Sequence, residues 1–152
     1  MLEKDITIDS NGNRLSGTVC LPEGEGRFPL VMMVHGSGRL DRDENTAGYP
    51  LNVFNTIAHY LAHRGIASLR YDKRGCGKST GDFCTTGHSD LVDDAVNWFD
   101  TLTQHVLSEP DKIFVLGHSE GCIIAPQVSA KRPAVAGLIL LCPFTVNANF
   151  NR

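Results

Sequence analysis

A serine flanked by glycines, in Gly117-His-Ser-Glu-Gly121, is the pattern in this sequence with the clearest chemical meaning. A serine hydroxyl can act as a nucleophile in acyl transfer when the backbone holds it near donors aimed at the developing oxyanion. The pattern follows the apolar run Ile113–Leu116 and precedes a helical segment, which is the setting of a nucleophile turn. Gly117 and Gly121 would leave room for a tight turn that forces Ser119 into a strained conformation. A serine in an ordinary strand-to-helix turn is the alternative.

A second pattern, Gly75-Cys-Gly-Lys-Ser-Thr80, resembles a phosphate-binding loop. Such a loop requires a glycine five positions before the Gly-Lys pair, and it must enter a helix at the Lys-Ser step. Asp72 occupies the place of that glycine, and Gly81-Asp82 follows where a helix should begin. Nucleotide binding is therefore kept only as a remote alternative.

Strands and helices alternate along most of the chain. Alternating polar and apolar residues in Asp5–Asp9 and Arg14–Leu21, joined by Ser-Asn-Gly-Asn, predict an antiparallel hairpin. Continuous apolar runs are typical of strands buried on both faces, whereas a stripe of apolar residues with helical spacing predicts a helix. These patterns predict strands at Phe28–Val34, Ile66–Tyr71, Ile113–Leu116 and Ala136–Cys142, with helices starting near Pro50, capped by Ser89, and spanning residues 120–131.

This alternation predicts an α/β fold with a mostly parallel sheet, helices on both faces and an N-terminal antiparallel hairpin. The turn Glu109-Pro-Asp-Lys should separate the second helix, whose apolar face we expect to end at Val106, from the next strand. The 152 residues are enough for one core, so residues 1–152 are expected to form a single domain.

Composition narrows the classes of partner. The net charge is -3 with both signs interspersed, so no basic surface for nucleic acid or an anionic membrane is expected. The polar N-terminus and the lack of a long apolar segment favour a cytoplasmic protein. The five cysteines are scattered and never spaced as Cys-x-x-Cys, so neither a disulfide framework nor a metal site is implied. No cofactor is implied, and the oligomeric state cannot be predicted.

Three motifs together resemble the α/β-hydrolase superfamily of serine hydrolases, in particular its serine-aminopeptidase-like and acyl-esterase branch. They are His35-Gly-Ser-Gly38 with Asp41-Arg-Asp43, Tyr71-Asp-Lys-Arg-Gly-Cys-Gly-Lys-Ser79, and the nucleophile pattern. The resemblance implies that Ser119 attacks an ester or amide carbonyl of a small ester or short peptide. It also implies that the backbone N–H groups of Ser37 and Glu120 bind the oxyanion. The remaining motif residues would support these loops: His35, Gly36, Gly38, Asp72, Arg74, Gly75, Gly77, Gly117, His118 and Gly121.

The resemblance is incomplete. Members of the superfamily place an acid and then a histidine after the nucleophile, but after Ser119 this sequence contains no Asp or His, and its only acid is Glu120. We therefore expect the chain to cover most of the first half of a longer hydrolase, interrupted after about the sixth strand. Ala136–Cys142 would then be an uncovered apolar edge, and the chain alone would have weak activity or none. A noncatalytic binding module and an inactive truncated product remain alternatives.

Overall fold

The computed structural model describes residues 1–144, so the last eight residues of the predicted domain lie outside the described part. One six-stranded sheet and three helices make up its regular structure. In chain order the elements are β1 (Leu2–Ser10), β2 (Asn13–Leu21), β3 (Phe28–Val34), α1 (Val53–Ala62), β4 (Ala67–Tyr71), α2 (His88–Gln104), β5 (Ser108–His118), α3 (Gly121–Lys131) and β6 (Gly137–Leu141).

The strand order in the sheet is β1-β2-β4-β3-β5-β6. The first two strands form the predicted hairpin, in which Ser10 pairs with Asn13 across Asn11-Gly12. Both turn residues have positive φ, of 51° and 80°, as a two-residue hairpin turn requires. β2 pairs antiparallel with β4, and the remaining neighbours are parallel. The predicted fold class is therefore confirmed.

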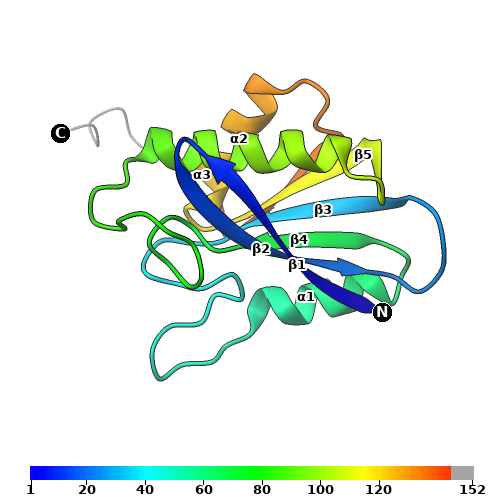
Figure 1. The fold of residues 1–152 in the computed structure, drawn as a ribbon, viewed down its shortest axis with the longest axis horizontal. Coiled ribbons are helices and arrows are strands. Elements are labelled where there is room, and N and C mark those ends of the chain that lie inside the picture. Colours follow the sequence, from blue (N-terminus) through cyan, green and yellow to red (C-terminus); the bar gives the residue numbers. More distant parts are fainter. Residues whose placement is uncertain (145–152) are drawn as a thin grey trace.

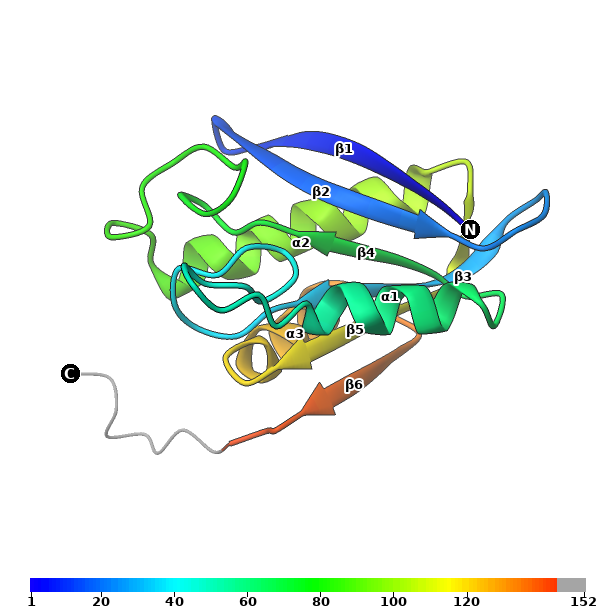
Figure 2. The same cartoon turned by 90° about the horizontal axis from the view of Figure 1, so that it is seen from below.

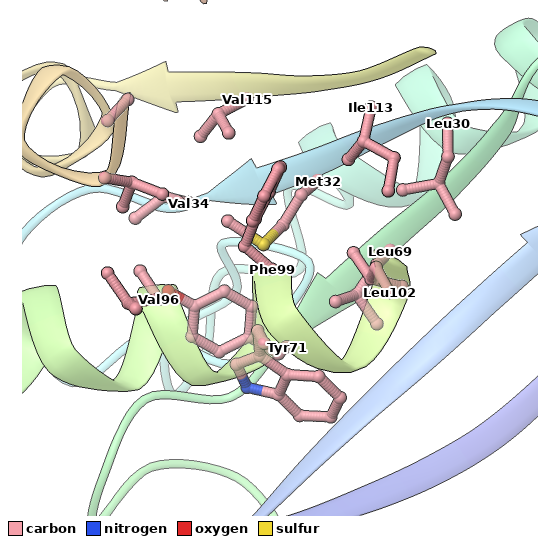
Figure 3. Close-up of a cluster of buried hydrophobic side chains, with 14 of the residues drawn as sticks. Leu30, Met32, Val34, Leu69, Tyr71, Val96, Phe99, Leu102, Ile113 and Val115 are labelled. Atoms are coloured by element: carbon pink, nitrogen blue, oxygen red, sulfur yellow. The ribbon is translucent and has the colours of Figure 1, made fainter. Parts of the chain in front are cut away.

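Helices cover both faces of the sheet, with α2 and α3 on one side and α1 on the other (Figures 1 and 2). Figure 3 shows the larger core, where Val96, Phe99 and Leu102 of α2 pack against side chains of β3, β4 and β5. Phe54, Ala58 and Ala62 of α1 fill the smaller core on the opposite face. The central strands contribute to both cores, which explains why their sequences are continuously apolar.

The first helix begins and ends by different means. It starts at Val53 rather than near Pro50, after Asn52 in a left-handed conformation. Its end is the predicted glycine cap. Gly65 has a φ of +79°, and its N–H donates to the Ala62 carbonyl at 3.1 Å while that of Ile66 donates to the Leu61 carbonyl at 3.1 Å. This pair of bonds is a Schellman motif, which needs a residue that tolerates positive φ.

Predictions at the ends of α2 were wrong. The N-cap is Gly87 rather than Ser89, and the Gly87 N–H donates to the Asp90 carboxylate at 2.9 Å. The helix ends at Gln104, which leaves Val106 beyond it and 72% exposed. The predicted turn Glu109-Pro-Asp-Lys lies within β5, where a register shift against β3 accommodates it. A strand irregularity and a turn have the same residue preferences, so composition could not separate them.

The last strand, β6, lies at the edge of the sheet (Figure 2). Leu138, Ile139 and Leu140 are each 38% exposed, although their sequence is that of a buried strand. The predicted uncovered apolar edge is thus present in the described part of the chain. None of the described helices combines the length and apolar character needed to cross a membrane.

Candidate active site

The predicted nucleophile lies in the turn between β5 and α3. Ser119 has a φ of +50°, a left-handed conformation that is uncommon for a residue with a side chain. Its N–H donates to the Leu141 carbonyl of β6 at 3.0 Å, and its carbonyl accepts the Cys122 N–H at 2.9 Å. These bonds hold the turn against the neighbouring strand, so the strained conformation is fixed by its surroundings.

Both glycines of this turn are required because a side chain at either position would overlap the backbone. A Cβ at Gly117 would lie 2.2 Å from the Gly121 carbonyl oxygen, and one at Gly121 would lie 2.1 Å from the Val34 carbonyl oxygen. Both neighbours are backbone atoms that cannot move aside cheaply. The strand, turn and helix therefore approach one another more closely than any other residue type permits, as the sequence pattern predicted.

The turn after β3 lies next to the nucleophile. Val34 pairs with Gly117 in the sheet, and a Cβ built on Gly36 would lie 3.5 Å from the Cβ of Ser119. Gly38, with a φ of +97°, lets the chain reverse after Ser37. Within residues 1–144 the N–H groups of Ser37 and Glu120 have no protein acceptor. Both donors predicted for an oxyanion therefore remain available, and their catalytic role stays a prediction.

The two histidines of the predicted motifs have different surroundings. His35 is completely buried, its Nδ1 lies 3.0 Å from the Gly36 carbonyl oxygen, and burial lowers its pKa to about 3. His118 is partly exposed, and its Nδ1 lies 2.6 Å from Oε1 of Glu44. Each contacts a neighbouring loop in the structure, and the loop-supporting role expected for both stays a prediction.

Sequence reasoning missed Glu44, although it lies close to the turn. Its side chain is 5% exposed, and Oε1 accepts the Gly36 N–H at 2.9 Å in addition to contacting His118. Glu44 lies in a loop with no periodic pattern, so its burial could not be predicted from neighbouring residues. Its φ of +63° shows that the loop is held in an uncommon conformation.

Lys73 was also missed as a site residue. It is the second residue after β4, and its side chain is 4% exposed. Its Nζ donates to the carbonyls of His35 and Gly36 and to Oε2 of Glu120. Burial lowers the pKa of Lys73, although the adjacent Glu120 carboxylate opposes that effect. The available signal was the run of three charged residues, Asp72-Lys-Arg74, after a buried strand, because such residues must be either exposed or paired.

In the turn that resembles a phosphate-binding loop, the Asp72 carboxylate is bound by other groups of the protein. The Asp72 carboxylate accepts the N–H groups of Arg42 and Lys78, at 2.7 and 2.9 Å, and pairs with the Arg42 guanidinium at 2.6 Å. A Cβ at Gly77 would lie 2.4 Å from the Asp72 carboxyl carbon, and Gly75 has a φ of +68°. The turn leads to α2 only at His88. These contacts argue against nucleotide binding here.

Arg74 connects the same turn to α2, one of the helices that cover the sheet. Its guanidinium donates to both carboxylate oxygens of Asp94 in α2, at 2.7 and 2.8 Å, and Asp94 also accepts the Ser10 hydroxyl. Both Arg74 and Asp94 are buried. Asp72 and Arg74 thus order loops near the nucleophile, while their contribution to activity stays a prediction.

A small cavity of about 90 Å³ is lined in part by Glu120, one of the two predicted oxyanion donors. Its wall combines apolar side chains with buried charges, and its lining residues are Gly38, Lys73, Arg74, Phe83, Thr86, Leu91 and Glu120. The Arg39 guanidinium lies 5.2 Å from the centre of the Phe83 ring and restrains that loop. The cavity thus reaches from Glu120 to Leu91 of α2.

One group of residues elsewhere has the donor types of a metal site. Ligand atoms of Glu3, Cys20 and His59 lie within 4.8 Å of one another on the α1 side of the sheet. However, Oε1 of Glu3 already accepts the Arg70 guanidinium at 2.8 Å and lies 3.0 Å from Nε2 of His59. A metal ion at this oxygen would be repelled by the Arg70 guanidinium. We therefore interpret the group as an ion-pair network.

The fold and the nucleophile turn together define an α/β hydrolase. The solved structure of the α/β hydrolase GrgF from Penicillium sp. sh18 matches this fold with a TM-score of 0.75 and 23% sequence identity. The match covers 92% of this chain and 45% of GrgF.

Residues 47–150 match the family described as "Serine aminopeptidase, S33", and the chain belongs to that family. Esterase EstD of Thermotoga maritima is 36% identical over 141 residues, which are 93% of this chain and 32% of EstD. Monoglyceride lipase of Mus musculus is 27% identical over 91% of this chain and 42% of its own length. The chain thus spans less than half the length of these two relatives.

Proposed function

We propose that this chain supplies the nucleophile and the oxyanion-binding groups of a serine hydrolase that cleaves a small carboxylic ester through an acyl-enzyme on Ser119. The observation that carries the proposal is the strained left-handed conformation of Ser119, held between two glycines that no other residue could replace. Strain of this kind is typical of a nucleophile turn. The names of both relatives, an esterase and a lipase, favour an ester over an amide.

In the proposed reaction the Ser119 oxygen attacks the carbonyl carbon of the ester, and the hydroxyl proton passes to a base. The carbonyl oxygen becomes an oxyanion that accepts the Ser37 and Glu120 N–H groups. The C–O bond to the alcohol then breaks, and the alcohol leaves with the proton. Water attacks the acyl-enzyme in the same way, so that a carboxylic acid is released and the Ser119 hydroxyl is restored.

The base and its partner acid are proposed to come from outside these 152 residues, because the sequence after Ser119 contains neither histidine nor aspartate. The buried His35 cannot reach a substrate, and the motif that contains His118 assigns it a loop-supporting role. The relatives are also much longer than this chain. The complete gene product is therefore the right material for testing the proposal.

The test is labelling of that complete gene product, expressed from its own reading frame, with a fluorophosphonate probe. The expected result is a labelled peptide that contains Ser119, hydrolysis of p-nitrophenyl acetate in preference to an amino-acid p-nitroanilide, and loss of both label and hydrolysis in Ser119→Ala. Ser89→Ala, which changes an exposed serine at the start of α2, is the matched control and should keep both. Specific binding of esters without labelling would instead favour a noncatalytic binding module.

A further inference from the structure

The two peptides that meet at Gly36, His35–Gly36 and Gly36–Ser37, are both held by charged side chains. The Gly36 N–H donates to Oε1 of Glu44 at 2.9 Å, and the Gly36 carbonyl accepts Nζ of Lys73 at 3.0 Å. Lys73 also holds the preceding carbonyl, that of His35, at 2.8 Å. The peptide that presents the Ser37 N–H therefore cannot rotate without breaking a bond to a charged side chain.

The same two side chains also hold the residues on either side of the nucleophile. Glu44 contacts Nδ1 of His118 at 2.6 Å, and Lys73 pairs with Oε2 of Glu120 at 2.8 Å. His118 and Glu120 are the sequence neighbours of Ser119. Two buried charges thus connect the turn after β3 to the turn after β5, one on each side of Ser119.

The contrast in exposure between these partners is informative. The side chains of Lys73 and Glu44 are 4% and 5% exposed, whereas those of Glu120 and His118 are 30% and 32% exposed. Lys73 directs its ammonium group at three acceptors, which uses all three N–H bonds. Charges in such positions are costly unless fully paired, and apolar residues would fill the space more cheaply. Their placement beside a strained serine favours a role in function.

We propose that Lys73 and Glu44 are positioning residues, which set the spacing and direction of the Ser37 and Glu120 N–H groups so that both point at one oxyanion. This inference rests on the proposed function. Lys73 fixes the carbonyl of the Gly36–Ser37 peptide and the side chain of Glu120. Glu44 fixes the N–H of the preceding His35–Gly36 peptide, whose carbonyl Lys73 also binds. Neither side chain touches the substrate in this arrangement.

The chemical consequence concerns the transition state more than the bound substrate. An oxyanion donor contributes about 10²- to 10³-fold to turnover, and a displacement of about 1 Å can cost about 10²-fold. The oxyanion exists only after attack. A loosened donor should therefore lower kcat while KM changes little.

The experiment uses the complete gene product and the variants Lys73→Met and Glu44→Gln. Each should lower kcat for p-nitrophenyl acetate by about 10- to 100-fold, with KM within about threefold of the wild-type value. Affinity for an aryl trifluoromethyl ketone, whose serine adduct carries an oxyanion, should fall by the same factor as kcat/KM. Lys131→Met is the matched control, because Lys131 forms an exposed pair with Asp93 on the far end of α3.

The outcomes separate the two proposals. Unchanged kcat and unchanged ketone affinity in both variants, together with inactive Ser119→Ala, would overturn the positioning role alone. Activity that survives Ser119→Ala would overturn the proposed function and this inference with it. If Lys73→Met does not fold, Glu120→Gln tests the same contact from its exposed end, since it keeps the backbone N–H and weakens only the bond to Lys73.

Discussion

Two glycine-rich turns follow β4 and β5, the strands on either side of β3, and they use glycine differently. In Gly75–Thr80 the left-handed positions belong to glycines, and the Lys78 N–H is bound by the Asp72 carboxylate. In Gly117–Gly121 the left-handed position belongs to Ser119, and the glycines provide close approach instead. The first turn is internally satisfied. The second leaves strain on a reactive residue and the Glu120 N–H available, which is what catalysis requires.

The largest effects are expected from adding one methyl group to each turn, which tests whether the two turns differ in function. Gly121→Ala places a Cβ against the Val34 carbonyl and should cost about 3 kcal/mol of unfolding free energy, together with loss of labelling at Ser119. Gly77→Ala places a Cβ against Asp72 and should also destabilise the protein, but the folded fraction should still be labelled. Urea unfolding and fluorophosphonate labelling of the complete gene product measure both effects.

Equal loss of labelling per folded molecule in the two variants would contradict the distinction between a structural turn and a reactive one. Gly12→Ala provides a baseline, because Gly12 has positive φ in the hairpin turn but nothing within 4 Å of its Cβ position. Its cost should reflect the backbone conformation alone, about 1 kcal/mol.

A change of pH tests the buried histidine beside the nucleophile turn. Burial lowers the His35 pKa from 6.5 to about 3, so between these values the unfolded chain binds a proton that the folded chain does not. Stability from this group is therefore complete above pH 6.5 and is lost as the pH falls, by about 2 kcal/mol at pH 5. In His35→Asn this part of the pH dependence should disappear from urea unfolding curves measured between pH 5 and 7.

His63→Asn, at an exposed position just after α1, should leave the pH dependence as in the wild-type protein. Identical pH slopes for the wild-type protein and His35→Asn would show that His35 takes up a proton freely in the folded state.

The smallest effect is expected from removing the strain at Ser119 instead of adding a methyl group to a turn. Ser119→Gly removes the cost of the left-handed conformation and should raise the unfolding free energy by about 0.5 to 1 kcal/mol while abolishing labelling. Ser89→Gly, in the first turn of α2, should lower it by about 0.5 kcal/mol. If both variants lower stability equally, Ser119 stores no strain.

The sequence predicted the sheet and the nucleophile turn because both depend on local patterns. Apolar runs identified β3 and β4, and the paired glycines around Ser119 identified the turn. Glu44 and Lys73 could not be assigned to the site, because their partners beside Ser119 are distant in sequence and their burial depends on how three loops meet. The limits of α2 and the irregular part of β5 were missed because several residue types satisfy the same cap or bend.

The bond from the Ser119 N–H to the Leu141 carbonyl has a consequence for how the protein is made. Leu141 closes β6, which is synthesised only after the whole of α3. A nascent chain that ends within α3 already contains the complete serine motif, but it lacks the strand that holds the motif in shape. Parallel pairing of β6 with β5 joins segments separated by a helix and closes a loop before any contact is gained. The reactive geometry is therefore assembled only once β6 has been made, after the five strands that precede it in the chain.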